Sequence, residues 1–203
     1  MQTNKSHKFI VFEGIDGSGK STQANLLSTK FTNEHINHIL KKEPGDTIIG
    51  EEIRKLLSDE SDMASLTELF LFSAARKELV DKKIIPALNN DKTVILDRYI
   101  YSTIAYQGYG RNLDLKYINQ INKIATNSLK PDVVFLLDID PNISSSRIDS
   151  ESLDRIESEP IEFYNKVRKG YLSIAKDNPE LWIILDGSES PSQIHTRIWA
   201  HIN

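Results

Sequence analysis

The chain has 203 residues, of which 25 are Lys or Arg and 29 are Asp or Glu, so its formal net charge is −4. This length suits one α/β domain, and the acidic balance argues against a polybasic protein that binds nucleic acid or a membrane surface. The sequence has no Cys and no apolar run near the ~18 residues of a membrane span, which excludes disulfides and thiolate metal sites and predicts a cytoplasmic protein.

Five short runs rich in Val, Ile, Leu and Phe predict β-strands. They cover residues 9–12, 36–40, 93–96, 133–137 and 182–185. Each run is a compact apolar cluster, which is typical of strands that are covered by helices on both faces. Amphipathic segments between the runs predict helices over residues 20–32, 50–57, 66–88, 115–127, 161–176 and 192–202. This alternation predicts a doubly wound α/β fold with a parallel sheet.

No linker, repeat or low-complexity tract divides the chain, so we expect a single domain over residues 1–203. Pro86 is expected to kink or end the third predicted helix. The most polar stretch, residues 144–160, reads as a solvated loop and helix end. The five histidines are scattered without the spacing of metal ligands, so no histidine metal site is expected.

The first predicted strand is followed by a phosphate-binding motif. Residues 14–21 read Gly-Ile-Asp-Gly-Ser-Gly-Lys-Ser, which fits G-x-x-x-x-G-K-[ST], and Thr22 opens a predicted helix. The glycines allow backbone N–H groups to face phosphate oxygens at the helix N-terminus. Lys20 is expected to reach the outer phosphates, and the hydroxyl of Ser21 to bind Mg²⁺. The motif predicts binding of a nucleoside triphosphate.

The phosphate-binding motif alone leaves a GTPase, a motor ATPase and a small-molecule kinase open. A GTPase would need an Asn-Lys-x-Asp base reader, and the nearest match, residues 122–125, lacks the Asp. A motor ATPase usually ends a later strand in an acidic pair, whereas residues 93–96 are followed by Asp97 and Arg98. An acid and a base at a strand end place a carboxylate for Mg²⁺ beside a guanidinium for phosphate.

An aromatic residue and an arginine share one face of the third predicted helix. Phe72 and Arg76 are four residues apart, and together they offer a stacking plane and a fork of donors to a nucleobase. Such stacking contributes about 1–3 kcal/mol, although a phenylalanine in this position is more often part of a core. Gln107, among several tyrosines after Arg98, can donate to and accept from a base edge.

These residues lie in blocks that resemble the thymidylate kinase family of P-loop nucleoside monophosphate kinases. The blocks are FEGIDGSGKST, KEPGDTIIGEEIRKLL, LFSAARKELVDKKIIPAL, ILDRYIYSTIAYQGYGR, PDVVFLLDIDP, LDRIE and FYNKVRKGYL. They stand in the family's order and cover nearly the whole chain. The resemblance implies a five-stranded parallel sheet wrapped by helices, a mobile lid at about residues 144–159 and a homodimer. It also implies transfer of the γ-phosphoryl group of ATP to dTMP, giving dTDP and ADP, with Mg²⁺.

The resemblance further implies a donor site and a set of catalytic residues. ATP would be held by Gly14, Ile15, Asp16, Gly17, Ser18, Gly19, Lys20, Ser21, Thr22 and Arg147. Mg²⁺ would be held by Ser21 and, through water, by Asp97. Catalysis would depend on Lys20, Asp97, Arg98 and Arg155.

The acceptor site is implied in the same way. The residues that would hold dTMP are Asp16, Glu43, Pro44, Arg54, Phe72, Arg76, Arg98, Ser102, Thr103, Tyr106 and Gln107. Phe72 would stack on thymine, Arg76 would donate to its O4, and Gln107 would read the opposite edge. Asp16 would hold the sugar 3′-hydroxyl, and Tyr106 would press on C2′ and disfavour ribonucleotides. Arg54 and Arg98 would face the phosphate.

The chain departs from the family pattern at the phosphate loop and in the lid. One branch of the family has an arginine where this chain has Gly17, and the other branch normally has several basic residues in the lid. Here the lid carries only two, Arg147 and Arg155, among the acids Asp149, Glu151, Asp154 and Glu157. We therefore expect Arg155, in the LDRIE block, to supply charge in the transition state, unless the acids beside it hold it in an ion pair.

Two smaller departures lie at the acceptor site. Lys42 replaces the arginine usual before Glu43, and Thr103 stands where many relatives have serine. Neither change removes a hydrogen-bond donor.

Two other functions remain open from sequence alone. One is a related P-loop nucleotide or nucleoside kinase with another acceptor base, and the other is an inactive regulator that binds ATP. The intact set of Lys20, Ser21, Asp97 and Arg98 argues against the regulator.

Overall fold

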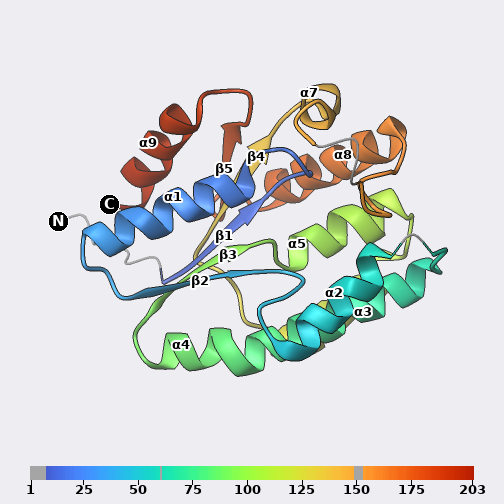
Figure 1. Ribbon diagram of the computed structural model, residues 1–203, viewed down its shortest axis with the longest axis horizontal. Coiled ribbons are helices and arrows are strands. Elements are labelled where there is room, and N and C mark those ends of the chain that lie inside the picture. The colour runs from blue at the N-terminus through green and yellow to red at the C-terminus, as the bar shows by residue number, and fades with distance from the viewer. Residues whose placement is uncertain (1–7, 60, 149–152) are drawn as a thin grey trace.

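The computed structural model describes residues 8–59, 61–148 and 153–203 and is built on a five-stranded parallel sheet (Figure 1). The strands are β1 (Phe9–Glu13), β2 (His38–Lys42), β3 (Thr93–Asp97), β4 (Val133–Asp138) and β5 (Trp182–Asp186). Their order in the sheet is β2-β3-β1-β4-β5, and every neighbouring pair is parallel. The predicted α/β class and the five-stranded parallel sheet are confirmed.

The strand β2 begins two residues after the predicted start. Ile36 donates its N–H to the carbonyl of Phe31, so it closes the preceding helix instead of joining the sheet. His35 takes a left-handed conformation at φ 57°, which turns the chain sharply before the strand. The apolar run in the sequence therefore includes a helix-capping residue.

The helices cover both faces of the sheet. They are α1 (Lys20–Asn33), α2 (Ile48–Ser58), α3 (Ser65–Leu79), α4 (Ile85–Asn89), α5 (Ile100–Thr103), α6 (Leu115–Thr126), α7 (Pro141–Ser145), α8 (Ile161–Asp177) and α9 (Pro191–Ile202), with π-helical segments η1 (Val80–Ile84) and η2 (Ile104–Gly110). Helices α1 and α9 lie on one face, and α2 to α5 lie on the other (Figure 1). In the described part of the chain, every helix is too short or too polar to span a lipid bilayer.

Alternate residues of the central strand serve two separate apolar cores. Ile10 and Phe12 of β1 pack with α1 and α9, whereas Phe9 and Val11 pack with η1, α4, α5 and α8. This alternation follows from the two-residue period of a strand. The three central strands β1, β3 and β4 are therefore buried on both faces, as their continuous apolar sequence predicts, whereas the edge strands β2 and β5 are partly exposed.

The helix predicted over residues 66–88 runs through Pro86 to Asn89. It changes to a π-helical turn at Val80–Ile84, and Pro86 then stands in the first turn of α4. Proline has no N–H to donate and its ring crowds the carbonyl four residues earlier, so a wider turn at this point accommodates it. Pro86 thus does not end the helix, which continues to Asn89 after the π-helical turn.

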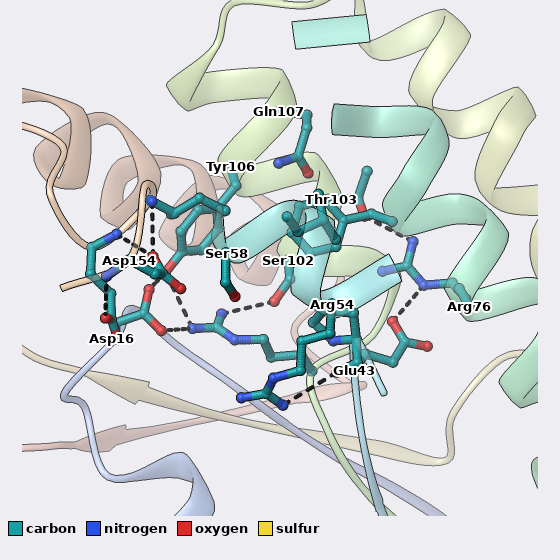
Figure 2. A pocket seen from close by; sticks show the side chains of 16 residues that line it. Asp16, Glu43, Arg54, Ser58, Arg76, Ser102, Thr103, Tyr106, Gln107 and Asp154 are labelled. Atoms are coloured by element: carbon teal, nitrogen blue, oxygen red, sulfur yellow. Dashed lines mark hydrogen bonds and ion pairs between the residues drawn. The ribbon is translucent and has the colours of Figure 1, made fainter. Parts of the chain in front are cut away.

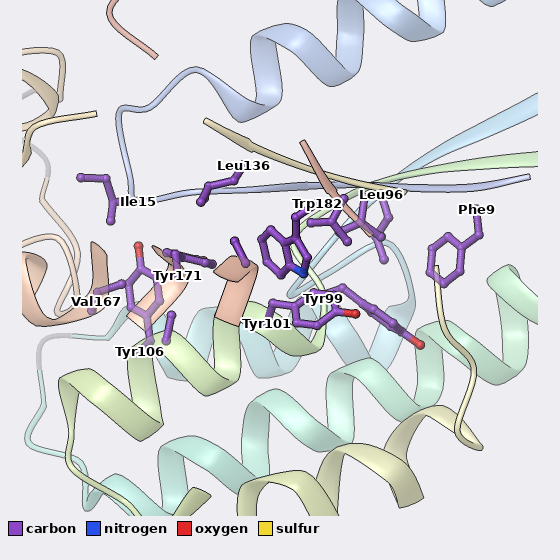
Figure 3. Packing of buried hydrophobic residues seen from close by; sticks show 14 of the residues in the cluster. Phe9, Ile15, Leu96, Tyr99, Tyr101, Tyr106, Leu136, Val167, Tyr171 and Trp182 are labelled. Carbon is purple, nitrogen blue, oxygen red and sulfur yellow. The ribbon is translucent and has the colours of Figure 1, made fainter. Parts of the chain in front are cut away.

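An aromatic cluster packs against one face of the sheet (Figure 3). The rings of Tyr101 and Trp182 meet edge to face, with centroids 4.7 Å apart. Tyr99 is fully buried beside Phe9. Tyr99 and Tyr101 therefore belong to the core, and of the tyrosines grouped after Arg98 in the sequence, Tyr106 is the one that lines a cavity at the site described below.

Candidate active site

Two neighbouring cavities lie at the carboxyl ends of β1 and β3, where parallel sheets place their ligands. The larger, of about 630 Å³, is lined by the phosphate-binding loop, and the smaller, of about 160 Å³, lies between α3, η2 and the turn after β2. The residues that line both cavities are Asp16, Glu43, Arg54, Arg98 and Glu157. Groups bound in the two cavities can therefore meet at a shared wall that carries two arginines.

The loop after β1 wraps around the side chain of Lys20. The Lys20 Nζ donates to the carbonyl oxygen of Ile15 at 2.8 Å, inside the loop. Burial, reinforced by the positive charge of Arg98, lowers the pKa of Lys20 to about 8. The buried ammonium therefore sits at the floor of the larger cavity with few competing partners, ready to bind an anion.

Gly17 sits where the α7 segment packs directly on the loop. A Cβ at this position would clash with the backbone carbonyl of Ser144, and the φ of Gly17 is 73°. The hydroxyl of Ser144 also donates to the carbonyl of Asp16 at 2.6 Å. The space that a side chain at position 17 would need is thus occupied by another segment of the chain.

The residues predicted for the donor nucleotide fall into two groups. Those that line the larger cavity are Asp16, Gly17, Ser18, Gly19, Lys20, Ser21, Thr22 and Arg147. Gly14 and Ile15 do not line it, but their carbonyl oxygens accept hydrogen bonds from Arg98 and Lys20 and so shape the loop. The guanidinium of Arg147 donates to the carbonyl of Gly187 at 2.9 Å and reaches over the edge of this cavity.

Ser21 and Asp97 meet at the predicted metal position. The Ser21 hydroxyl donates to Oδ2 of Asp97 at 2.5 Å, while the buried Oδ1 of Asp97 has no hydrogen-bond partner among the described residues. An unsatisfied carboxylate oxygen beside a hydroxyl suits a hard divalent cation. The described residues contain no group of three or more His, Asp or Glu placed to hold a metal by themselves, so phosphate and water oxygens would have to complete the ligand shell.

All of the residues predicted to hold dTMP line the smaller cavity (Figure 2). Arg98 lies on the wall that this cavity shares with the larger one: its guanidinium pairs with Asp16 and donates to Ser102 Oγ at 3.1 Å. The hydroxyl of Tyr106 donates to the other oxygen of Asp16 at 2.7 Å. Although burial by itself raises the pKa of Asp16, Arg98 and Lys20 outweigh it and lower that pKa to about 2.

Arg98 reaches this position through an uncommon backbone conformation. Its φ is 70°, in the left-handed region that non-glycine residues rarely enter. Its N–H donates to Phe12 in β1 at 2.9 Å, which holds the strained residue in place. Strain of this kind concentrates at functional sites.

Arg76 lies deeper in the smaller cavity than its predicted role suggests, because its side chain is only 1% exposed. Its Nε donates to Glu43 at 2.7 Å, and burial raises the pKa of Glu43 to about 7 in spite of this pairing. Its remaining bonds go to Thr103, Asn122 and the carbonyl of Tyr99. These four hydrogen bonds to described residues use four of the five N–H groups of the Arg76 guanidinium. One N–H on Nη2 is left for a ligand.

The structure does not bring Arg155 to the phosphate loop. Its Nη1 pairs with Glu68 of α3 at 2.7 Å, and it lines a third cavity together with Arg111 and Glu159. Its neighbour Asp154 does not pair with it, and accepts hydrogen bonds from the backbone N–H groups of residues 156 and 157. The buried carboxylate of Glu68 on another element therefore decides where Arg155 points. Within the predicted lid, residues 149–152, including Asp149 and Glu151, lie outside the described residues.

Several residues that line the cavities were not among the predicted site residues. The smaller cavity also contains Leu57, Ser58, Asp154, Ile156 and Glu157, and the larger one also contains Gln23, Lys42, Gly187, Glu189, Pro191 and Ile194. Those from residue 187 onward follow β5. Because ligands of parallel sheets bind beyond the carboxyl ends of the strands, the position of the fifth strand was a signal for them. Of the others, Lys42, Leu57, Asp154, Ile156 and Glu157 stand in blocks that resemble the family, whereas Gln23 and Ser58 have no such signal.

Comparisons with known proteins identify the family of the chain. The family model for thymidylate kinase matches residues 12–198. Thymidylate kinase of Chlorobaculum tepidum is 47% identical over 96% of both chains, and that of Chlorobium limicola is 44% identical over 95% of this chain and 93% of the relative. The crystal structure of thymidylate kinase from Ehrlichia chaffeensis aligns with a TM-score of 0.79 at 37% identity, covering 96% of this chain and 98% of the other. The chain belongs to the thymidylate kinase family.

Proposed function

We propose that this chain transfers the γ-phosphoryl group of ATP to dTMP, with dTDP and ADP as products. The observation that carries this function is the pair of cavities that share Asp16, Arg54 and Arg98, one built on a phosphate-binding loop and the other on a base-sized pocket with an aromatic wall. Family membership assigns the same ATP-dependent transfer. The transfer requires that the phosphoryl donor and acceptor approach in line, and the shared wall permits this approach.

The larger cavity is assigned to ATP. The loop N–H groups and Lys20 bind its phosphates, and Arg147 covers the nucleotide from the α7 segment. Ser21 and Asp97 are the residues that would hold Mg²⁺, which neutralises charge on the phosphates when it is bound. The buried, unpaired oxygen of Asp97 supports this assignment.

The smaller cavity is assigned to dTMP. Phe72 forms an aromatic wall for the base, and the free N–H of Arg76 is available to its O4. Asp16 and Tyr106 lie together at the sugar position, where Asp16 would accept from the 3′-hydroxyl. Because the acceptor is already a phosphate oxyanion, no residue has to remove a proton. The chain acts by placing the two nucleotides, supplying positive charge and excluding water.

The direct test is ADP release in a coupled assay with a panel of nucleoside monophosphates. We expect dTMP to give the highest kcat/KM. Faster turnover of a monophosphate with another base would favour the related-kinase alternative, and ATP binding without turnover of any acceptor would favour the inactive regulator.

The titration of Lys20 predicts how ATP use depends on pH. The free enzyme holds Lys20 with a pKa of about 8, so the ammonium that binds phosphate is lost as the pH rises above that value. We expect kcat/KM for ATP, which reports the free enzyme, to fall by up to about tenfold per pH unit above pH 8. At saturating ATP the bound phosphates raise this pKa, so kcat should fall less. A level kcat/KM up to pH 10 would show that Lys20 keeps an ordinary pKa of about 10.4.

We propose that the chain forms a homodimer through an apolar surface on α2, α3 and α6. Helix α3 packs against both of the others. Phe70 of α3 is 57% exposed, and Tyr117 and Ile124, seven residues apart on α6, are 60% and 73% exposed. Leu56 of α2 and Leu66 of α3 are also more than half exposed. Grouped exposed apolar side chains of this kind mark contact surfaces.

Phe70→Asp is expected to convert the dimer to monomer at micromolar concentration, because it buries a charge in the proposed contact. Light scattering coupled to size-exclusion chromatography measures this. Ile143→Asp is the matched control, since Ile143 is exposed on α7, which lies away from α2 and α3 (Figure 1). A wild-type protein that is monomeric at every concentration, or a dimeric Phe70→Asp variant, would contradict the proposal.

A further inference from the structure

Glu68 is a buried carboxylate to which the mechanism above gives no role. It lies on α3, is 1% exposed, and does not line the acceptor cavity. Its Oε1 accepts from Gln107 Nε2 at 2.8 Å, and its Oε2 accepts from Arg111 at 3.2 Å and pairs with Arg155 at 2.7 Å. Glu68 therefore connects a residue at the base cavity to two arginines behind it.

These donors keep Glu68 ionised. Burial alone raises the pKa of Glu68, but the hydrogen bonds from Arg111, Gln107 and Arg155 and the charge of Arg111 outweigh it, so that pKa lies below its usual value. An ionised carboxylate only accepts hydrogen bonds. The side of the Gln107 amide that faces Glu68 must therefore be its NH₂ group.

The orientation of this amide decides what it presents to a base. Gln107 is 2% exposed and lines the acceptor cavity, whereas Glu68 lies outside it. With the NH₂ group turned to Glu68, the carbonyl oxygen is the group left for the cavity, and Figure 2 shows the amide end of Gln107 directed toward the other lining side chains. Turning the amide over would set its oxygen against the carboxylate, which is repulsive in a buried site.

A carbonyl oxygen facing the base distinguishes pyrimidines by their N3 atom. In thymine and uracil, N3 carries a hydrogen and donates. In cytosine, N3 carries a lone pair and can only accept. A fixed acceptor therefore pairs with the first two bases and leaves an unpaired, repulsive contact with the third, which is the kind of mismatch that buried polar sites reject strongly.

We propose that Glu68 is a positioning residue for pyrimidine choice: it holds the amide of Gln107 with its carbonyl oxygen toward the base, so that the site selects an N3–H donor over cytosine. The inference rests on the assignment of the smaller cavity to dTMP. Arg111 and Arg155 act one step further back, because they hold Glu68 in its ionised form.

Glu68→Gln tests this positioning role. Its neutral amide can either donate or accept, so it no longer fixes the orientation of Gln107. We expect the affinity ratio of dTMP to dCMP, measured by titration calorimetry, to fall at least about tenfold. The ratio of dTMP to dUMP should stay within about twofold, because both bases carry N3–H, and KM for ATP should also stay within about twofold. Glu78→Gln, the same change later on α3 and outside both nucleotide cavities, should alter none of these values.

A second variant keeps the test independent of the folding of Glu68→Gln. Gln107→Met keeps the size of the side chain but removes both hydrogen-bonding groups, and it should lower the dTMP to dCMP ratio by a similar factor. In the Gln107→Met background, Glu68→Gln should have no further effect on that ratio. An unchanged ratio in Gln107→Met, or in a folded Glu68→Gln, would overturn the inference and leave the proposed function standing. Absence of dTMP turnover by the wild-type protein would instead overturn the function itself.

Discussion

Lys20→Ala is expected to lower kcat by at least about 10²–10³-fold while the protein remains folded. The ammonium of Lys20 is the cation at the floor of the donor cavity, and it is held inside the loop by the carbonyl of Ile15. Preorganised charge at a transferring phosphoryl group is among the largest single contributions to catalysis. The side chain borders a cavity, so its removal enlarges that cavity and leaves no void in the apolar core.

Steady-state kinetics and thermal unfolding of Lys20→Ala check this expectation together. Activity near that of the wild type would contradict the assignment of the loop to the ATP phosphates. A large fall in melting temperature would show instead that Lys20 is required for the fold. Lys30→Ala on the same helix is the control, because Lys30 is paired with Glu34 on the surface and lines neither cavity.

The parts of the fold that the sequence predicted are those with a strong hydrophobic period. All five strands and the six longer helical regions follow from apolar clusters and amphipathic patterns. The segment Ile100–Gly110 was missed because its Tyr, Ser, Thr and Gly residues are poor helix formers. Tertiary contacts hold it in place: Glu13 accepts from the backbone N–H groups of Tyr99 and Ser102, and η2 packs on α8.

The candidate site divides in the same way. Residues in short blocks at strand ends, such as Asp97 and Arg98, were predicted because neighbouring strands bring such ends together. The environment of Arg155 was not predicted, because its partner Glu68 lies on another element. The residues around Glu68 in the sequence do not indicate that its carboxylate is buried. The LDRIE block therefore marks a segment that resembles the family, but it does not predict the direction in which its arginine points.

The positions of the arginines predict which of them supplies positive charge to the phosphoryl group during transfer. Arg54 and Arg98 are the arginines in the described part of the chain that line both cavities. Arg54 makes one long hydrogen bond, to the carbonyl of Pro44 at 3.3 Å. Arg98 is fixed by Asp16, Ser102 and the carbonyl of Gly14, so it is the better preorganised of the two.

Arg98→Ala is therefore expected to lower kcat by about 10³-fold, within the range of roughly 10³–10⁵ that a phosphoryl-transfer arginine contributes. KM for dTMP should rise as well, because Arg98 lines the cavity assigned to dTMP, whereas KM for ATP should change little. Arg98→Lys keeps the charge but loses the planar fork, so it should recover only part of kcat. Steady-state kinetics with each substrate varied measures these effects. Thermal unfolding checks that the variant stays folded when Asp16 and Tyr106 lose Arg98 as a partner.

Arg155→Ala is the decisive comparison for Arg98. Since Arg155 is paired with Glu68 and lies outside both nucleotide cavities, its loss should lower kcat by less than about tenfold. A loss in Arg155→Ala as large as that in Arg98→Ala would mean that the lid arginine leaves Glu68 and reaches the phosphoryl group during turnover. The same result would return Arg155 to the role that its sequence block predicts. An arginine that stayed paired with Glu68 throughout turnover would have no direct effect on the transition state, and its loss would not lower kcat so far.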